Sequence, residues 1–158
     1  MKHVITALVE NRPGVLARVV GLISGRGYNI ESLSVGPTND PSMSRITMQV
    51  PGDDRVLEQV NKQLNKLIDV IKVTDLTKEP FLNCELVLVK VNATRETRSE
   101  IIALVKGSPN AQVLAVQSKS LIIQIIGEQV KVAEFLELLK PFQILDLTRS
   151  GIIAMGKE

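Results

Sequence analysis

A short polar turn, Asn11-Arg12-Pro13-Gly14, separates an apolar run from a helical pattern. The unpaired backbone N–H groups at a helix N-terminus carry partial positive charge and can hold a carboxylate. Gly14 has no Cβ, so a ligand can approach the backbone there, and the Asn11 amide can bind a ligand or cap the helix. The turn is therefore a candidate ligand site. The alternative is a capped helix with Pro13 in its first turn and no ligand.

A second polar segment, Gly27-Tyr28-Asn29-Ile30-Glu31, opens the second predicted strand. The Asn29 amide can donate and accept hydrogen bonds, which suits the ammonium and carboxylate groups of an α-amino acid. The alternative is a turn at the start of a strand, in which Gly27 and Asn29 serve only the backbone. Asn29 is therefore a second candidate for amino-acid binding.

Residues that could catalyse a reaction are few. The single histidine, His3, begins the first strand, and the single cysteine, Cys84, begins an apolar strand. We expect an incidental histidine and a small buried hydrophobe, because a Cys–His pair would need these two distant residues. Zinc-ligand spacing, a Walker phosphate loop and a GxSxG elbow are absent. The carboxylates Asp53 and Asp54 start a helix, where they complement its dipole. We therefore expect neither catalytic residues nor a metal site.

The elements that must position the two polar segments occur twice along the chain. Apolar periodicity predicts strands in the first half at 3–9, 28–35, 46–50 and 69–76, with helices at 15–23 and 57–67. The same order returns with strands at 85–91, 112–117, 120–126 and 143–149, and helices at 95–106 and 129–139. The predicted fold class is α+β, with two tandem ferredoxin-like βαββαβ units whose antiparallel sheets carry helices on one face.

The predicted boundaries are 1–77 and 81–158, joined by a short linker. In this topology the second strand lies at the sheet edge, and an exposed edge is a template for pairing with another chain. A unit of this size also buries little core by itself. We therefore expect a homodimer formed through these sheet edges. Such pairing would bring Asn29 of one chain to the Asn11–Gly14 turn of the other.

Composition narrows the classes of protein that the chain can belong to. Apolar residues make up 44% and aromatic residues only 3%, so the core must be aliphatic. The 19 basic and 17 acidic residues are interspersed, without the basic face or stacking aromatics of a nucleic-acid binder. No apolar run approaches the roughly 20 residues of a membrane span. The N-terminal residues lack the layout of a targeting peptide, so we expect a cytoplasmic protein without membrane or nucleic-acid partners.

Two segments resemble known regulatory proteins. NRPGVLARV, residues 11–19, resembles the signature of ACT domains, which are amino-acid-binding modules of metabolic regulation. RGYNIESLSVGPTNDPSMSRITMQV, residues 26–50, closely resembles the conserved block of acetohydroxyacid (acetolactate) synthase small subunits. The resemblance continues through residues 56–73, 85–91 and 149–158, and so spans essentially the whole chain.

The resemblance implies a regulatory subunit that has no catalytic residues and no cofactor of its own. In the family, a large catalytic subunit uses thiamine diphosphate, magnesium and FAD to form acetolactate from pyruvate and also forms acetohydroxybutyrate, which are early steps toward valine, leucine and isoleucine. The small subunit activates that enzyme and confers feedback inhibition, commonly by valine bound between paired ACT domains. The implied partners are the large subunit, a second copy of the chain and a branched-chain amino acid.

Carried over by motif, the effector-binding residues are Asn11, Gly14 and Asn29 and, as secondary candidates, Ile30 and Leu16. The ACT domain at 1–77 would bind the effector and dimerise, and the domain at 81–158 would contribute to activation. The alternative function is a free-standing ACT sensor that controls transcription or another enzyme. A transcriptional sensor should carry a helix-turn-helix or a basic arm, and the sequence has neither.

Overall fold

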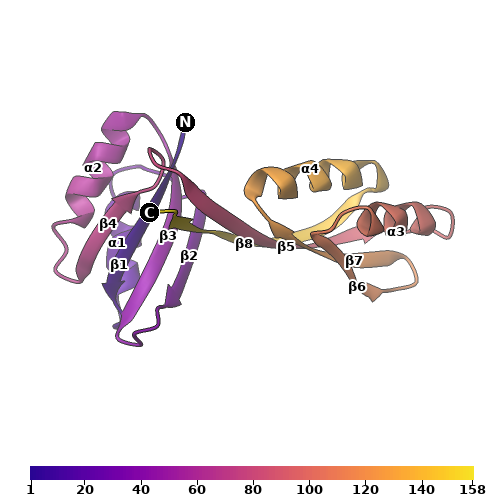
Figure 1. Cartoon of the computed structure of the whole chain (residues 1–158), viewed down its shortest axis with the longest axis horizontal. Helices are drawn as coiled ribbons and strands as arrows, with labels where there is room; N and C mark the ends of the chain where they lie inside the picture. Colours follow the sequence, from indigo (N-terminus) through magenta and orange to yellow (C-terminus); the bar gives the residue numbers. More distant parts are fainter. The chain divides into compact units, whose positions relative to one another are not determined.

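The computed structural model describes all residues, 1–158, and they form two compact units. The first unit contains residues 1–82 and 152–158, and the second contains residues 83–151. Figure 1 shows each unit as a sheet with two helices on one face. The predicted fold class, two tandem ferredoxin-like units, is confirmed.

The first unit follows the predicted order βαββαβ. Its elements are β1 (Lys2–Glu10), α1 (Val15–Ser24), β2 (Ser32–Pro37), β3 (Met43–Pro51), α2 (Asp54–Leu64) and β4 (Val70–Asp75). The antiparallel sheet has the order β2-β3-β1-β4, so β2 lies at one edge, as predicted.

The core of the first unit lies between its sheet and its helices. Alternate residues of β1, Ile5, Ala7 and Val9, are buried against helix residues that recur at steps of three and four. The helix residues are Val15, Val19, Ile23, Leu57, Val60 and Leu64. Burying one such side chain contributes about 1.5–3 kcal/mol. The backbone N–H groups of Arg55 and Val56 donate to the Asp53 carboxylate at 3.0 Å, so Asp53 caps α2.

The second unit repeats the arrangement with a different core. Its elements are β5 (Phe81–Asn92), α3 (Arg98–Lys106), β6 (Ala111–Val116), β7 (Ser120–Gly127), α4 (Gln129–Leu139), a 3₁₀ turn (Lys140–Phe142) and β8 (Ile144–Gly156). The sheet order is β6-β7-β5-β8, which again leaves the second strand of the unit at an edge. Alternate residues of β5 and β7 form its core: Val87, Val89, Val91, Leu121, Ile123 and Ile125.

The C-terminal segment, residues 152–158, departs from the predicted range of the second domain, 81–158. The predicted last strand ends at 149, whereas β8 continues through Gly151, whose φ is +76°, to Gly156. Ile152 and Ala154 then pack with Val4 and Leu76 of the first unit. The apolar alternation of the segment predicts a strand, but it carries no information about which of the two cores the strand joins.

Three smaller differences concern single elements. Strand β2 begins at Ser32 rather than at residue 28, so Asn29 precedes the strand. The expected buried Cys84 is only half-buried. His3 is buried, and its Nε2 lies 3.1 Å from the Gly52 carbonyl oxygen.

None of the helices combines the length and the apolar character needed to cross a bilayer.

Candidate functional site

Asn11 is held by the hairpin that joins β2 to β3. Its backbone N–H donates to the Ser42 carbonyl at 2.8 Å, and its side-chain Nδ2 donates to the Pro41 carbonyl at 3.0 Å. The interpretation of Asn11 as a helix cap is wrong, because Gly14 is the N-cap residue of α1 and no side chain caps the helix. The side chain remains exposed at the end of the sheet where β1 ends and α1 begins.

The hairpin is itself fixed by a local hydrogen-bond network. The Asp40 carboxylate accepts hydrogen bonds from the Ser42 hydroxyl at 2.7 Å and from the Ser42 backbone N–H at 3.0 Å. These two donors hold the pKa of Asp40 below its usual value, because they stabilise the ionised carboxylate. The turn thus sets the position of the Pro41 carbonyl, which in turn orients Asn11. No apolar pattern could have predicted this support.

Gly14 immediately precedes the first helical residue, so Pro13 lies before the helix and not in its first turn. It is the N-cap residue of α1, its φ is +85°, and no side chain caps the helix. No acidic residue lies in the first turn of α1, in contrast to α2, which has the Asp53 cap and Asp54. The positive end of the α1 dipole is therefore left without a carboxylate partner from its own first turn.

Arg18 and Asp69 support this turn and were missed in the sequence. The Arg18 guanidinium donates to the same Asp69 carboxylate oxygen at 2.6 Å from Nη2 and at 3.0 Å from Nε. The backbone N–H of Glu10 also donates to the Asp69 carbonyl. This pair joins α1 to the loop before β4. Leu16 and Val20, each two residues from Arg18, lie on the opposite flank of α1, and Leu16 is exposed.

Asn29 and Ile30 lie at the other end of the sheet. Asn29 is exposed, while Ile30 packs against the core of the first unit. The next residue, Glu31, donates from its backbone to the Gln49 carbonyl at 3.0 Å and forms an ion pair with Lys2 at 2.8 Å. Asn11 follows the last residue of β1, whereas Asn29 lies near its first. Nine extended residues separate these ends by about 25 Å, so one chain cannot place both amides on one small ligand.

Strand β2, at the edge of the first sheet, and helix α1 each carry an exposed apolar side chain. Val35 on β2 is 44% exposed, and Leu16 on α1 is 40% exposed. The outer backbone groups of an edge strand have no partner within the sheet. An edge strand with an exposed apolar side chain is a surface that a second copy of the chain can cover.

The positive φ of Gly14 predicts that a side chain at this position destabilises the protein. We expect Gly14→Ala to lower the free energy of unfolding by about 1–2 kcal/mol, because a Cβ disfavours this backbone conformation and would lie 3.2 Å from Nη1 of Arg18. The matched control is Gly21→Ala in α1, where a Cβ meets no atom within 4 Å. That change should raise stability by about 0.5–1 kcal/mol. Denaturant unfolding measures the stability of both variants. Equal effects of the two substitutions would contradict the left-handed conformation of Gly14.

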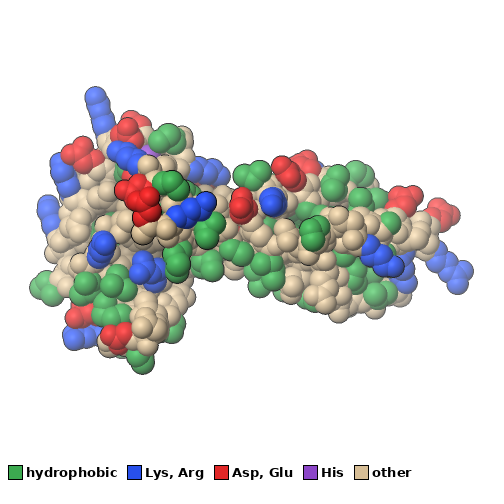
Figure 2. Space-filling view, in the orientation of Figure 1, with side chains coloured by type: hydrophobic (Ala, Val, Ile, Leu, Met, Phe, Trp, Pro, Cys, Tyr) green, Lys and Arg blue, Asp and Glu red, His purple; other side chains and the backbone are tan.

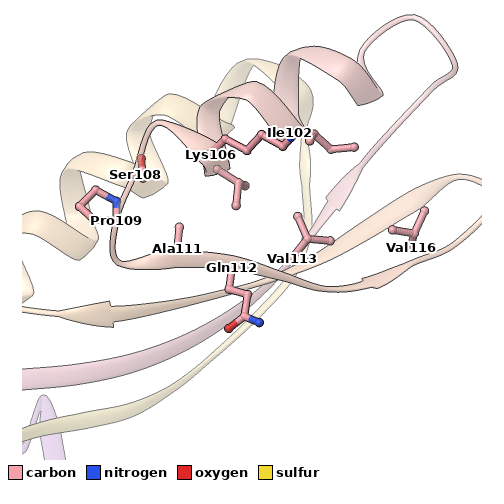
Figure 3. Close-up of a pocket in the computed structure, with 9 residues that line it drawn as sticks. Ile102, Lys106, Ser108, Pro109, Ala111, Gln112, Val113 and Val116 are labelled. Carbon is pink, nitrogen blue, oxygen red and sulfur yellow. The ribbon is translucent and has the colours of Figure 1, made fainter.

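The second unit contains a groove that involves none of the predicted effector residues. It has a volume of about 550 Å³ and lies between α3 and the edge strand β6. Figure 3 shows Ala111, Val113 and Val116 pointing from β6 toward α3, while Gln112 points away.

Figure 2 shows charges of both signs interspersed on the visible face of each unit. No group of three or more His, Cys, Asp or Glu side chains is arranged to hold a metal ion.

Comparisons with known proteins agree along the whole chain. Residues 5–72 match a family described as the AHAS small subunit-like ACT domain, and residues 84–158 match a family described as the small subunit of acetolactate synthase. The chain is 49% identical to a probable acetolactate synthase small subunit of Archaeoglobus fulgidus, covering 98% of this chain and 96% of the relative. It is 43% identical to the acetolactate synthase small subunit of Haemophilus influenzae, covering 99% and 96%.

A solved structure supports the same relationship. The crystal structure of the acetolactate synthase small subunit from Thermotoga maritima superposes with a TM-score of 0.88 at 37% identity. The match covers 100% of this chain and 98% of the Thermotoga chain. Sequence similarity and fold thus agree over both units, and the chain belongs to the family of acetolactate synthase small subunits, with an ACT domain in its first unit.

Proposed function

We propose that this chain activates the catalytic large subunit of acetolactate synthase and makes it sensitive to a branched-chain amino acid, valine or else leucine or isoleucine. The effector binds where the first units of two chains meet. Catalysis, with thiamine diphosphate, magnesium and FAD, belongs to the large subunit. The observation that carries the proposal is the separation of Asn11 and Asn29 at opposite ends of a sheet in which β2 is an edge strand.

Pairing of two β2 strands about a two-fold axis would join the separated groups. In such an antiparallel pair, the start of one strand lies opposite the end of the other. Asn29 precedes the start of β2, and Asn11 is hydrogen-bonded to the hairpin that follows its end. Each dimer therefore has two equivalent sites, and each site takes Asn29 from one chain and the Asn11–Gly14 turn from the other.

The chemistry of each half fits one part of an α-amino acid. The N-terminus of α1 carries partial positive charge, and the first turn of the helix has no acidic residue, so it suits the effector carboxylate. The Asn29 amide can accept a hydrogen bond from the ammonium group and donate one to the carboxylate. Leu16 and Ile30 would contact the aliphatic side chain of the effector. Such contacts favour valine, leucine or isoleucine over polar amino acids.

Inhibition follows from linkage between effector binding and the state of the dimer. An effector changes activity only if it binds one arrangement of the dimer more tightly than another. A tenfold loss of activation requires about 1.4 kcal/mol of coupling. A few hydrogen bonds that form across the dimer interface in only one arrangement can supply this difference.

Reconstitution tests the proposed function. The purified chain, given pyruvate, thiamine diphosphate, magnesium and FAD, should form no acetolactate. Adding it to the cognate large subunit should raise the activity of that subunit, and valine should then inhibit the complex but not the large subunit alone. The measurement is acetolactate formation across a titration of valine, leucine and isoleucine. Turnover by the chain alone, or a large subunit that is indifferent to it, would refute the proposal.

A further inference from the structure

The first residue of β2 is hydrogen-bonded to the C-terminal segment. The backbone N–H of Ile152 donates to the Ser32 hydroxyl oxygen at 2.9 Å, across 120 residues of sequence. Ser32 follows Asn29 by three residues and lies opposite Gln49 in the neighbouring strand β3. The strand that begins three residues after Asn29 therefore has a direct hydrogen bond to β8.

The C-terminal segment is anchored on the first unit along its length. Ile152 is 1% exposed and packs with Val4 and Leu76. The backbone N–H of Lys157 donates to the Pro80 carbonyl at 3.1 Å. A displacement at the start of β2 therefore acts on a fixed segment and not on a free terminus.

The residues just before this segment belong to the second unit and are held there. Ser150 accepts a hydrogen bond from the backbone N–H of Leu86 at 3.0 Å and donates to the Gly151 carbonyl at 2.6 Å. Gly151 is buried and has a φ of +76°, a conformation that residues with a Cβ rarely adopt. Ser150 and Gly151 thus belong to the second unit, and the next residue, Ile152, belongs to the first.

We propose that the Ser32–Ile152 hydrogen bond transmits effector binding from β2 to the second unit, so that Ser32 is a positioning residue for feedback inhibition. The inference rests on the proposed function. Effector contacts at Asn29 and Ile30 fix the start of β2, and Ser32 carries that change to Ile152. A displacement of Ile152 moves the adjoining Gly151 and Ser150, and the Ser150 hydroxyl is hydrogen-bonded to Leu86 of β5. A shift of about 1 Å is enough to break a hydrogen bond of this length.

The test uses the full chain as Ser32→Ala, reconstituted with the cognate large subunit, with valine as the probe. Valine affinity, measured by calorimetry on the small subunit alone, should change by less than about twofold, and activation without valine should be retained. The ratio of activities without and with saturating valine should fall roughly 2- to 10-fold toward one, because one hydrogen bond is lost. Ser32→Thr keeps the hydroxyl and should restore the ratio. Ser24→Ala, at the exposed end of α1, is the matched control.

The outcomes separate this inference from the proposed function. Unchanged inhibition in Ser32→Ala would overturn the inference and leave the proposed function standing. Loss of valine binding in Ser32→Ala would make Ser32 a ligand contact and would also overturn the inference. A wild-type complex that responds to none of valine, leucine and isoleucine would refute the proposed function and the inference together.

Discussion

Two variants that each lose effector binding should regain it when they share one dimer. Asn11→Ala and Asn29→Ala should each weaken binding by roughly 10- to 100-fold, because each removes a hydrogen bond to a charged group of the effector. A heterodimer of the two variants has one site in which both residues are alanine and one in which both are asparagine. We expect dual-tagged, purified heterodimers to bind one effector per dimer with wild-type affinity by calorimetry.

The matched control carries the same two substitutions on one chain. A heterodimer of Asn11→Ala/Asn29→Ala with wild type has one alanine in each site, so both sites should be weak. If each site instead lay within a single chain, the heterodimer of Asn11→Ala with Asn29→Ala would have two weak sites. The heterodimer of the double variant with wild type would then bind one effector with wild-type affinity. The pair of measurements therefore identifies the chains that build the site. The comparison is informative even though Asn11 also supports the hairpin through Pro41.

A second large effect should follow from truncating Ile152. We expect Ile152→Ala to lower the free energy of unfolding of the first unit by about 2–4 kcal/mol, because the side chain is buried against Val4 and Leu76 and its loss leaves a cavity. Ile153→Ala is the control, since Ile153 is 60% exposed on the same strand and should change stability by less than about 0.5 kcal/mol.

Tyrosine fluorescence can follow this effect in one unit. The chain has a single tyrosine, Tyr28, and no tryptophan, and Tyr28 packs against the core of the first unit. Denaturant unfolding monitored by Tyr28 therefore reports the first unit within the full chain. Equal midpoints for the Ile152 and Ile153 variants would contradict the packing of the C-terminal segment. A chain that ends near residue 80 lacks this segment altogether, so effector-binding experiments need the full chain.

Local periodicity predicted most of the fold. The alternation of Ile5, Ala7 and Val9 and the steps of Val15, Val19 and Ile23 depend only on neighbours along the chain, and these elements form as predicted. The start of β2 was placed too early, because Tyr28 and Ile30 alternate like strand residues. They pack against the core from a non-strand segment, and the Tyr28 backbone N–H donates to the Ile23 carbonyl.

The candidate site was only partly predictable, because the contacts that hold it join residues far apart in the sequence. Asn11 and Asn29 could be selected from turn composition and family resemblance, but their supports are distant in sequence. Asn11 contacts a carbonyl 30 residues away, and the Arg18–Asp69 pair spans 51 residues. Such partners leave no periodic signal. The left-handed conformation of Gly14 was equally hidden, because a glycine in sequence indicates freedom without stating whether it is used.

The packing of the last residues on the first unit also bears on how the chain is made. During synthesis, N-terminal domains generally fold first, as units, while later residues are still being added. Here the contacts of Val4 and Ser32 with the C-terminal segment can form only when Ile152 and Ala154 have emerged from the ribosome. The first unit is therefore completed only after the second unit has been synthesised. A prematurely terminated polypeptide that lacks these residues cannot assemble the complete first unit.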